Sequence, residues 1–137
     1  MPADFPVKIV TPTGEVLDTR ATYLRAPAVD GQVGVMARHA PMISELTIGA
    51  VRVTEGDGRQ RWFAVTGGAL RVTPDGAVIM VGAAEEATEI DIERARRALE
   101  RARHRLQQRA SESIDVTRAE LALARAYNRL RVAERAQ

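Results

Sequence analysis

Arginine side chains at helical spacing are the residues of this chain best suited to bind a ligand. On a helix, Arg94, Arg101 and Arg105 fall within about 40° of one another. A second stripe of the same kind consists of Arg118, Arg125 and Arg129. Guanidinium groups present planar forks of donors that fit carboxylates and phosphates. Converging stripes could bind a polyanion such as a nucleoside triphosphate; the alternative, which spacing alone favours, is two solvated helix faces.

The same phrase opens both arginine-bearing segments. IDIERA occupies residues 90–95 and IDVTRA occupies residues 114–119. An acidic residue near a helix start satisfies free N–H groups and complements the helix dipole. We predict Thr88 and Ser113 as the N-caps of the two helices. This structural explanation accounts for the second copy, whereas the arginines around the first copy leave a ligand contact open as well.

Other kinds of site have little support. The chain has no cysteine, which excludes a disulfide, a thiolate metal site and a cysteine nucleophile. Its two histidines are far apart, so we expect a loop or core position for His39, an exposed position for His104 and no metal site. Gly67-Gly68 is predicted to be a strand bend, because no helix follows at once. No nucleophile–base pair or Walker loop is visible, and no catalytic residue is assigned.

Glycine and proline divide the chain into two parts. All ten glycines and all six prolines precede residue 87, and the last fifty-one residues contain neither. Because both residues mark turns, the first part should form many short elements and the second part long helices. The balance of charge changes at the same point, from eight basic and ten acidic side chains to twelve and eight. We therefore predict two domains, residues 1–86 and 87–137.

The first domain is predicted to be all β. Short runs of apolar or alternating residues are separated by turn signals such as Pro12-Thr13-Gly14 and Pro74-Asp75-Gly76. The predicted strands are residues 7–11, 51–54, 61–65, 69–72 and 77–81. Strands at this spacing favour a sandwich or flattened barrel over a βαβ sheet.

The second domain is predicted to be an antiparallel two-helix hairpin, which makes the fold class α+β. Each helix, about 20 residues long, has one narrow apolar seam. The seams are Ala95, Leu99, Ala102 and Leu106 in the first helix and Val116, Ala119, Leu123, Ala126, Leu130 and Ala133 in the second. Alanine buries little apolar area, so we expect a marginal hairpin that either docks on something or comes apart.

The whole chain suits a globular protein with one ordinary core. It has 137 residues, of which 45% are hydrophobic and 28% charged. No secretory signal and no run of about 20 apolar residues is visible, so membrane insertion is not expected. The alternative that the arginine-rich helices bind nucleic acid is weakened by a net charge of only +2.

Several stretches, taken in order, resemble the epsilon subunit of bacterial F-type ATP synthases, a family related to chloroplast epsilon and mitochondrial delta subunits. They are VTPTGEV (10–16), DGQVGVMARHAP (30–41), FAVTGGALRV (63–72), IDIERA (90–95) and RAELALARAYNRL (118–130). The resemblance covers essentially the whole chain. It departs from the family pattern where Gln32-Val33 replaces Glu-Leu and where Ala37-Arg38 replaces Pro-Gly.

The resemblance implies a β-sandwich head that binds the gamma subunit and rests on the c-ring, followed by a mobile helical tail. Such a protein is a non-catalytic rotor subunit, peripheral to the cytoplasmic face of the bacterial plasma membrane. It couples ion-driven rotation of the c-ring to ATP synthesis. Its tail either folds down or extends along gamma toward the alpha and beta subunits, and the extended tail inhibits ATP hydrolysis.

The resemblance also implies site residues. Family members that bind ATP use I/L-D-x-x-R-A, a preceding glutamate and later arginines. The matching positions are Glu85, Ile90, Asp91, Arg94, Ala95, Arg101, Arg125 and Arg129. Gln32 and His39 match contacts to the c-ring or gamma. The resemblance implies no required cofactor; regulatory ATP, alone or with Mg²⁺, would favour the folded tail by a population shift.

Overall fold

The computed structural model describes residues 2–108 and 115–136 of the chain. The chain divides into two compact units, Met1–Glu86 and Ala87–Gln137. Strands build the first unit and helices build the second. The α+β fold class predicted from the sequence is therefore confirmed.

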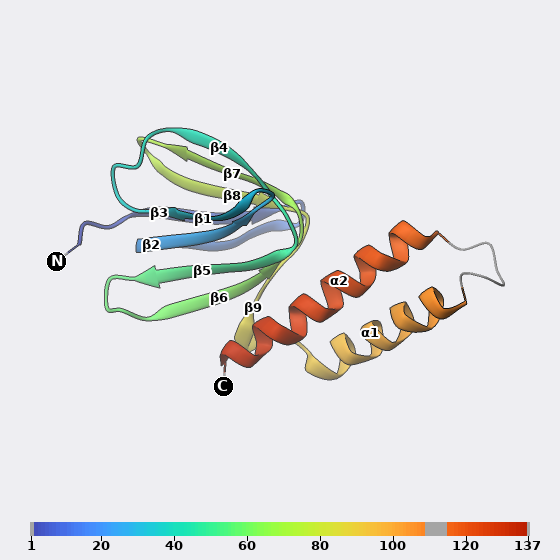
Figure 1. Ribbon diagram of the computed structural model, residues 1–137. Coiled ribbons are helices and arrows are strands. Elements are labelled where there is room, and N and C mark those ends of the chain that lie inside the picture. Colours follow the sequence, from blue (N-terminus) through green and yellow to red (C-terminus); the bar gives the residue numbers. More distant parts are fainter. Residues whose placement is uncertain (1, 109–114, 137) are drawn as a thin grey trace. The chain divides into compact units, whose positions relative to one another are not determined.

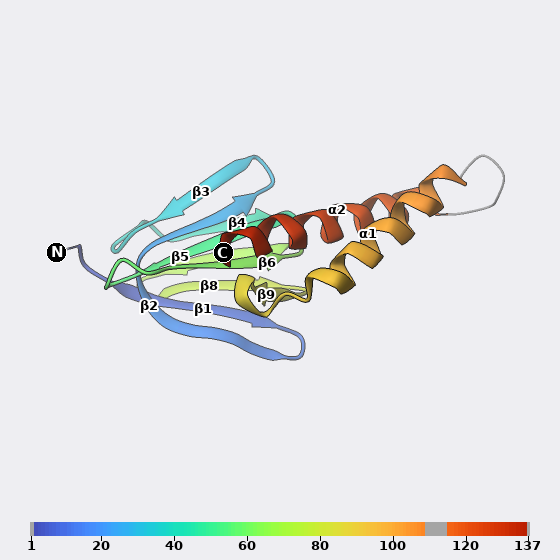
Figure 2. The same cartoon turned by 90° about the horizontal axis from the view of Figure 1, so that it is seen from below.

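The described strands of the first unit form a nine-stranded sheet that folds over on itself (Figure 1, Figure 2). They are β1 (Phe5–Thr11), β2 (Gly14–Ala28), β3 (Gly31–Val35), β4 (Met42–Leu46), β5 (Gly49–Glu55), β6 (Gln60–Val65), β7 (Gly68–Thr73), β8 (Gly76–Val81) and β9 (Ala84–Glu86). Their order is β1-β8-β7-β4-β2-β5-β6-β9, with β3 beside β2. Because β1 pairs in parallel with β8 and antiparallel with β2, the two layers of the sandwich are joined along β1.

Aliphatic side chains fill the space between the layers. The largest fully buried residues include Phe63, Ile9, Leu24, Leu70 and Ile79. On β5, Val51 and Val53 are buried and Arg52 between them is not, because successive side chains of a strand point to opposite faces. All five strands predicted from the sequence are present, and each is longer than predicted by one to three residues.

The turn from β7 to β8 needs its glycine. Thr73 pairs with Gly76 across the turn. Gly76 has a φ of 134°, and a Cβ there would lie 2.5 Å from the carbonyl oxygen of Pro6. Only a residue without a side chain fits both conditions, as the turn signal in the sequence predicts.

The helices of the second unit begin at aspartate caps. α1 (Ile92–Gln107) starts after Asp91, and α2 (Val116–Ala133) starts after Asp115. Each carboxylate accepts a hydrogen bond of 3.0 Å from the backbone N–H three residues later. The predicted cap at Thr88 is wrong: Thr88 lies within the 3-10 turn η1 (Ala87–Glu89), and a carboxylate complements the helix dipole better than a hydroxyl. Ser113 lies outside the described residues.

α1 and α2 pack side by side and antiparallel along their predicted seams (Figure 1, Figure 2). Every seam residue is buried or partly buried, and Ala95, Ala102, Ala119 and Ala126 are among the buried ones. The helices have 16 and 18 residues rather than about 20. A second 3-10 turn, η2 (Glu134–Ala136), follows α2. Among the described residues, no helix has the length and apolar character that crossing a membrane requires.

Candidate functional site

Three of the arginines matched to the nucleotide motif are exposed on the helices. Arg94 and Arg101 are exposed on α1, and Arg125 is exposed on α2. Within residues 2–108 and 115–136 none of the three has an ion pair, whereas Arg96 of α1 pairs with Glu93 at 2.7 Å. Arg94, Arg101 and Arg125 are therefore available to an anion.

The other motif residues build the start of the helix. Ile90 is 8% exposed and Ala95 is fully buried. The carboxylate of Asp91 caps α1 through the N–H of Arg94. Asp91 is exposed as well, but its carboxylate is used by the cap, so Arg94 is the charged residue of this motif whose side chain is left for a ligand. Arg129 on α2 is half-buried and has an interaction partner of its own.

The matched residues of the first unit lie on different elements. Glu85 is half-buried on β9. Gln32 is exposed on β3, and half-buried His39 follows in the connection to β4. The Nδ1 of His39 lies 2.7 Å from the carbonyl oxygen of Ala40, so we assign the proton of a neutral ring to Nδ1. Gln32 and His39 thus belong to one strand and its following connection. His104 is exposed, as expected.

Arg38, beside His39, adopts an unusual backbone conformation. Its φ is 64°, the only positive value at a non-glycine residue in the described part of the chain. A left-handed residue with a side chain is strained by about 1–2 kcal/mol. Glycine adopts this conformation without strain, whereas this loop carries an arginine there.

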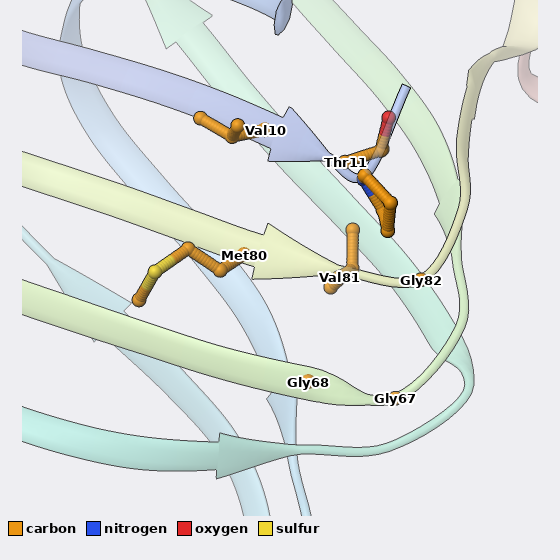
Figure 3. Close-up of a pocket in the computed structure, with 8 residues that line it drawn as sticks. Val10, Thr11, Gly67, Gly68, Met80, Val81 and Gly82 are labelled. Atoms are coloured by element: carbon orange, nitrogen blue, oxygen red, sulfur yellow. The ribbon is translucent and has the colours of Figure 1, made fainter. Parts of the chain in front are cut away.

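An apolar surface on the outside of the sandwich is a second candidate site. Met80 of β8 is 42% exposed. Ile43 of β4 is 77% exposed but lies apart from it, opposite the exposed Arg71 of β7. Val10 of β1 lies opposite Met80 in the sheet (Figure 3). Beside them is a groove of about 370 Å³, lined by Val10, Thr11, Pro12, Gly67, Gly68, Met80, Val81 and Gly82 (Figure 3). We call Val10, Met80 and this groove the β8 surface.

Glycine at position 68 lets the strands around the groove approach closely. Gly68 pairs with Val81 of β8 on one side and with Leu46 of β4 on the other. A Cβ on Gly68 would lie 2.0 Å from the carbonyl oxygen of Met80. Gly67-Gly68 therefore serves the close packing of strands at the start of β7. This agrees with the prediction that the pair is a feature of a strand and not a phosphate-binding loop.

An ion-pair cluster lies at the end of the first unit. The Nε and Nη2 atoms of Arg61 donate to the two carboxylate oxygens of Glu86, each at 2.8 Å. Arg61 Nη1 also lies 3.6 Å from Glu55, which accepts a 2.7 Å hydrogen bond from the hydroxyl of Thr19. The hydrogen bond from Arg61 lowers the pKa of Glu86 against the opposing effect of burial, and the same bond raises the pKa of Arg61.

Comparison with known families accounts for both units. Residues 4–87 match the beta-sandwich domain of the ATP synthase delta/epsilon chain, and residues 88–134 match its long alpha-helix domain. The chain belongs to the epsilon-chain family of F-type ATP synthases. Members of this family similar to it include the ATP synthase epsilon chains of Halalkalibacterium halodurans and Carboxydothermus hydrogenoformans. The first is 46% identical over 108 residues, which are 79% of this chain and 80% of the relative. The second is 46% identical over 103 residues, 75% of this chain and 76% of the relative.

Two solved structures share the fold of this epsilon-family chain. One is from the Euglena gracilis mitochondrial ATP synthase (OSCP/F1/c-ring). It has a TM-score of 0.79 at 24% identity, and the match covers 99% of this chain and 82% of the matched chain. The other is from the Tetrahymena thermophila mitochondrial ATP synthase (central stalk/c-ring). It has a TM-score of 0.56 at 16% identity, and the match covers 98% of this chain and 97% of the matched chain. The fold predicted by the resemblance is thus found in both.

Two features of this family member were not found from its sequence. The sequence does contain a signal for the β8 surface: Ala77–Val81 is a continuous apolar run, which is typical of a strand that is apolar on both faces. The Arg61–Glu86 pair had none, since its members are 25 residues apart and both belong to charged stretches.

Proposed function

We propose that this protein is the non-catalytic epsilon subunit of the central stalk of an F-type ATP synthase. In this role it is peripheral to the cytoplasmic face of a bacterial membrane and couples c-ring rotation to ATP synthesis. The observation that carries the proposal is the match of both family domains, in order, between residues 4 and 134.

Docking on the gamma subunit is proposed to use the β8 surface. Exposed apolar side chains that gather beside a groove are typical of protein-interaction sites. Gln32 and His39, on β3 and the connection after it, are the proposed contacts to the c-ring. Together these two surfaces would carry torque through the sandwich without any catalytic residue.

Binding of the full chain to purified gamma tests this part of the proposal. Met80→Asp puts a charge into the interface and should weaken binding by about tenfold or more. Met36→Asp changes an exposed methionine that follows β3 and is not part of the β8 surface, so it should leave binding to gamma unchanged. Equal affinities for the two variants would contradict docking through this surface.

The helical unit is proposed to inhibit ATP hydrolysis by the assembled enzyme when it extends toward the alpha and beta subunits. Its seams are rich in alanine and bury little area, so separating α1 from α2 costs little free energy. Deletion of residues 87–137 should leave binding to gamma intact and raise hydrolysis. Unchanged hydrolysis after the deletion would remove the inhibitory role.

Regulatory ATP is proposed to bind the helical unit through Arg94, Arg101, Arg125 and Arg129, with Ile90, Asp91 and Ala95 shaping the site and Glu85 as a further contact. The three exposed arginines without acidic partners in the described residues support this proposal. ATP at a hundredfold excess over its Kd would favour the binding posture by about 2.7 kcal/mol, enough to decide between postures of similar free energy.

Calorimetric titration of the full chain with ATP, with and without Mg²⁺, tests the nucleotide site. Arg94→Ala should abolish or strongly reduce binding. Arg96→Ala is a matched control, because Arg96 is exposed on the same helix but already paired with Glu93. Absence of binding in the unmodified protein, or equal losses in the two variants, would contradict the site.

A further inference from the structure

The boundary between the two units falls directly after a strand of only three residues. β9 ends at Glu86, and Ala87 begins the helical unit. β9 stands at one end of the strand order, where it pairs with β6. A strand this short at a sheet edge forms few backbone hydrogen bonds, so it opens easily unless other interactions hold it.

Hydrogen bonds from the backbone and from side chains hold β9 at both of its ends. Before the strand, the N–H of Thr66 donates to the carbonyl oxygen of Ala83 at 3.1 Å, and the N–H of Ala83 donates to the hydroxyl of Thr66 at 2.9 Å. At the last residue of β9, Arg61 of β6 donates two hydrogen bonds of 2.8 Å to the carboxylate of Glu86. The backbone of β9 is thus fixed between Ala83 and Glu86.

The Arg61–Glu86 pair differs from the surface ion pairs of this unit. Its side chains are 23% and 14% exposed, whereas those of the Arg20–Asp4 pair are 59% and 48% exposed. The guanidinium of Arg61 also lies 5.8 Å from the ring centroid of Phe63, a fully buried core residue. A shielded, two-bonded pair anchored to the core loses less to solvent screening than an exposed pair does.

We propose that Arg61 is a positioning residue, because by binding Glu86 it keeps β9 in register on β6. Glu85 is then held in place by the sheet. Any change in the conformation of the helical unit relative to β9 begins at Ala87. Glu85 pairs with Ala64 in the middle of β9, directly before the held residue. The role of Glu85 rests on the nucleotide binding proposed above, whereas the hold on β9 does not.

Hydrogen exchange of the full chain tests the hold on β9. Arg61→Gln and Glu86→Gln should each speed exchange of the Ala84–Glu86 amides by about tenfold. The double variant should exchange no faster than either single variant, because each change removes the same interaction. Arg20→Gln is the matched control and should leave these amides unchanged. Unchanged β9 exchange in Arg61→Gln, or additive effects in the double variant, would overturn the proposal.

The same measurement with ATP tests the link to Glu85. If ATP binds only when β9 is closed, a hundredfold excess over the Kd should slow exchange of the Ala84–Glu86 amides by about a hundredfold. Bound ATP that leaves β9 exchange unaffected would refute the positioning of Glu85. A protein that binds no ATP would refute the nucleotide site alone, because the exchange of the Gln variants still decides whether Arg61 holds β9.

Discussion

Replacement of Gly68 by alanine should destabilise the sandwich strongly although it adds a single methyl group. Gly68 opens β7 between β4 and β8, so a neighbour is paired on each side. The new Cβ would lie 2.0 Å from the carbonyl oxygen of Met80, 2.9 Å from its carbonyl carbon and 2.8 Å from the Cα of Val81. All three atoms belong to backbone, so no side-chain rotation relieves the overlap.

The size of the effect follows from what must move. Ordinary contact requires β8 to retreat by more than 1 Å from β7, which breaks ladder hydrogen bonds near Val81. Overpacking of this kind costs about 3 kcal/mol. Gly56 is the matched control, because a Cβ there meets no atom within 4 Å and its φ is not positive. Gly56→Ala should change stability by less than about 1 kcal/mol, and in the stabilising direction.

Urea unfolding of the full chain, followed by a probe of the strands such as Trp62 fluorescence, measures both variants. The midpoint of Gly68→Ala should fall while its m-value stays that of the unmodified protein, because the surface exposed on unfolding is the same. Equal midpoints for Gly68→Ala and Gly56→Ala would refute the reasoning, since it would mean that β7 and β8 separate at little cost.

Three further predictions concern caps, pH and the strained loop. Asp91→Ala and Asp115→Ala should each destabilise the helical unit by about 1 kcal/mol, seen as a lower midpoint in thermal unfolding followed by circular dichroism; an unchanged midpoint would contradict the cap geometry. The pKa of Glu86 lies below its ordinary value of 4.5 in the folded state, so its stabilising contribution is present above about pH 4.5 and is lost as the pH falls through the folded-state pKa. Glu86→Gln should flatten this acid limb in denaturation curves measured at successive pH values, and an unaltered limb would count against the pair. Arg38→Gly should stabilise the sandwich by about 1 kcal/mol because it relieves a left-handed residue, whereas Ala37→Gly should not; urea midpoints distinguish the two.

The sequence indicated five strands and both helices because their patterns are local. β2 escaped prediction for a physical reason. Its buried positions include Leu17 and Ala21 and then, beyond a register shift between Ala21 and Tyr23, Leu24. The shift changes which residues face the core, so no single period of two runs through the strand. β9 escaped because three residues carry no periodicity at all.

The candidate site was only partly visible in the sequence. Spacing identified Arg94 and Arg101 as members of one helix stripe, and both are exposed on α1. Spacing puts Arg96 on another side of the helix, about 200° from Arg94, but it could not show that Arg96 forms an ion pair with Glu93. The cap at Asp91 was missed because Thr88 is also a good capping residue, and only the backbone path through η1 selects between them. Interactions across the sheet depend on register, which residue types alone do not fix.

The parallel pairing of β1 with β8 determines how late during synthesis this part of the sheet can form. β1 ends at Thr11 and β8 ends at Val81, so a ribosome must add seventy more residues before the first strand meets this neighbour. At 5–20 residues per second this takes about 4–14 s. Until then β1 has an open edge that other nascent chains can pair with. The β8 surface, which needs both strands, therefore forms only after residue 81 is synthesised, whereas the contacts within each helix form as soon as that helix leaves the ribosome.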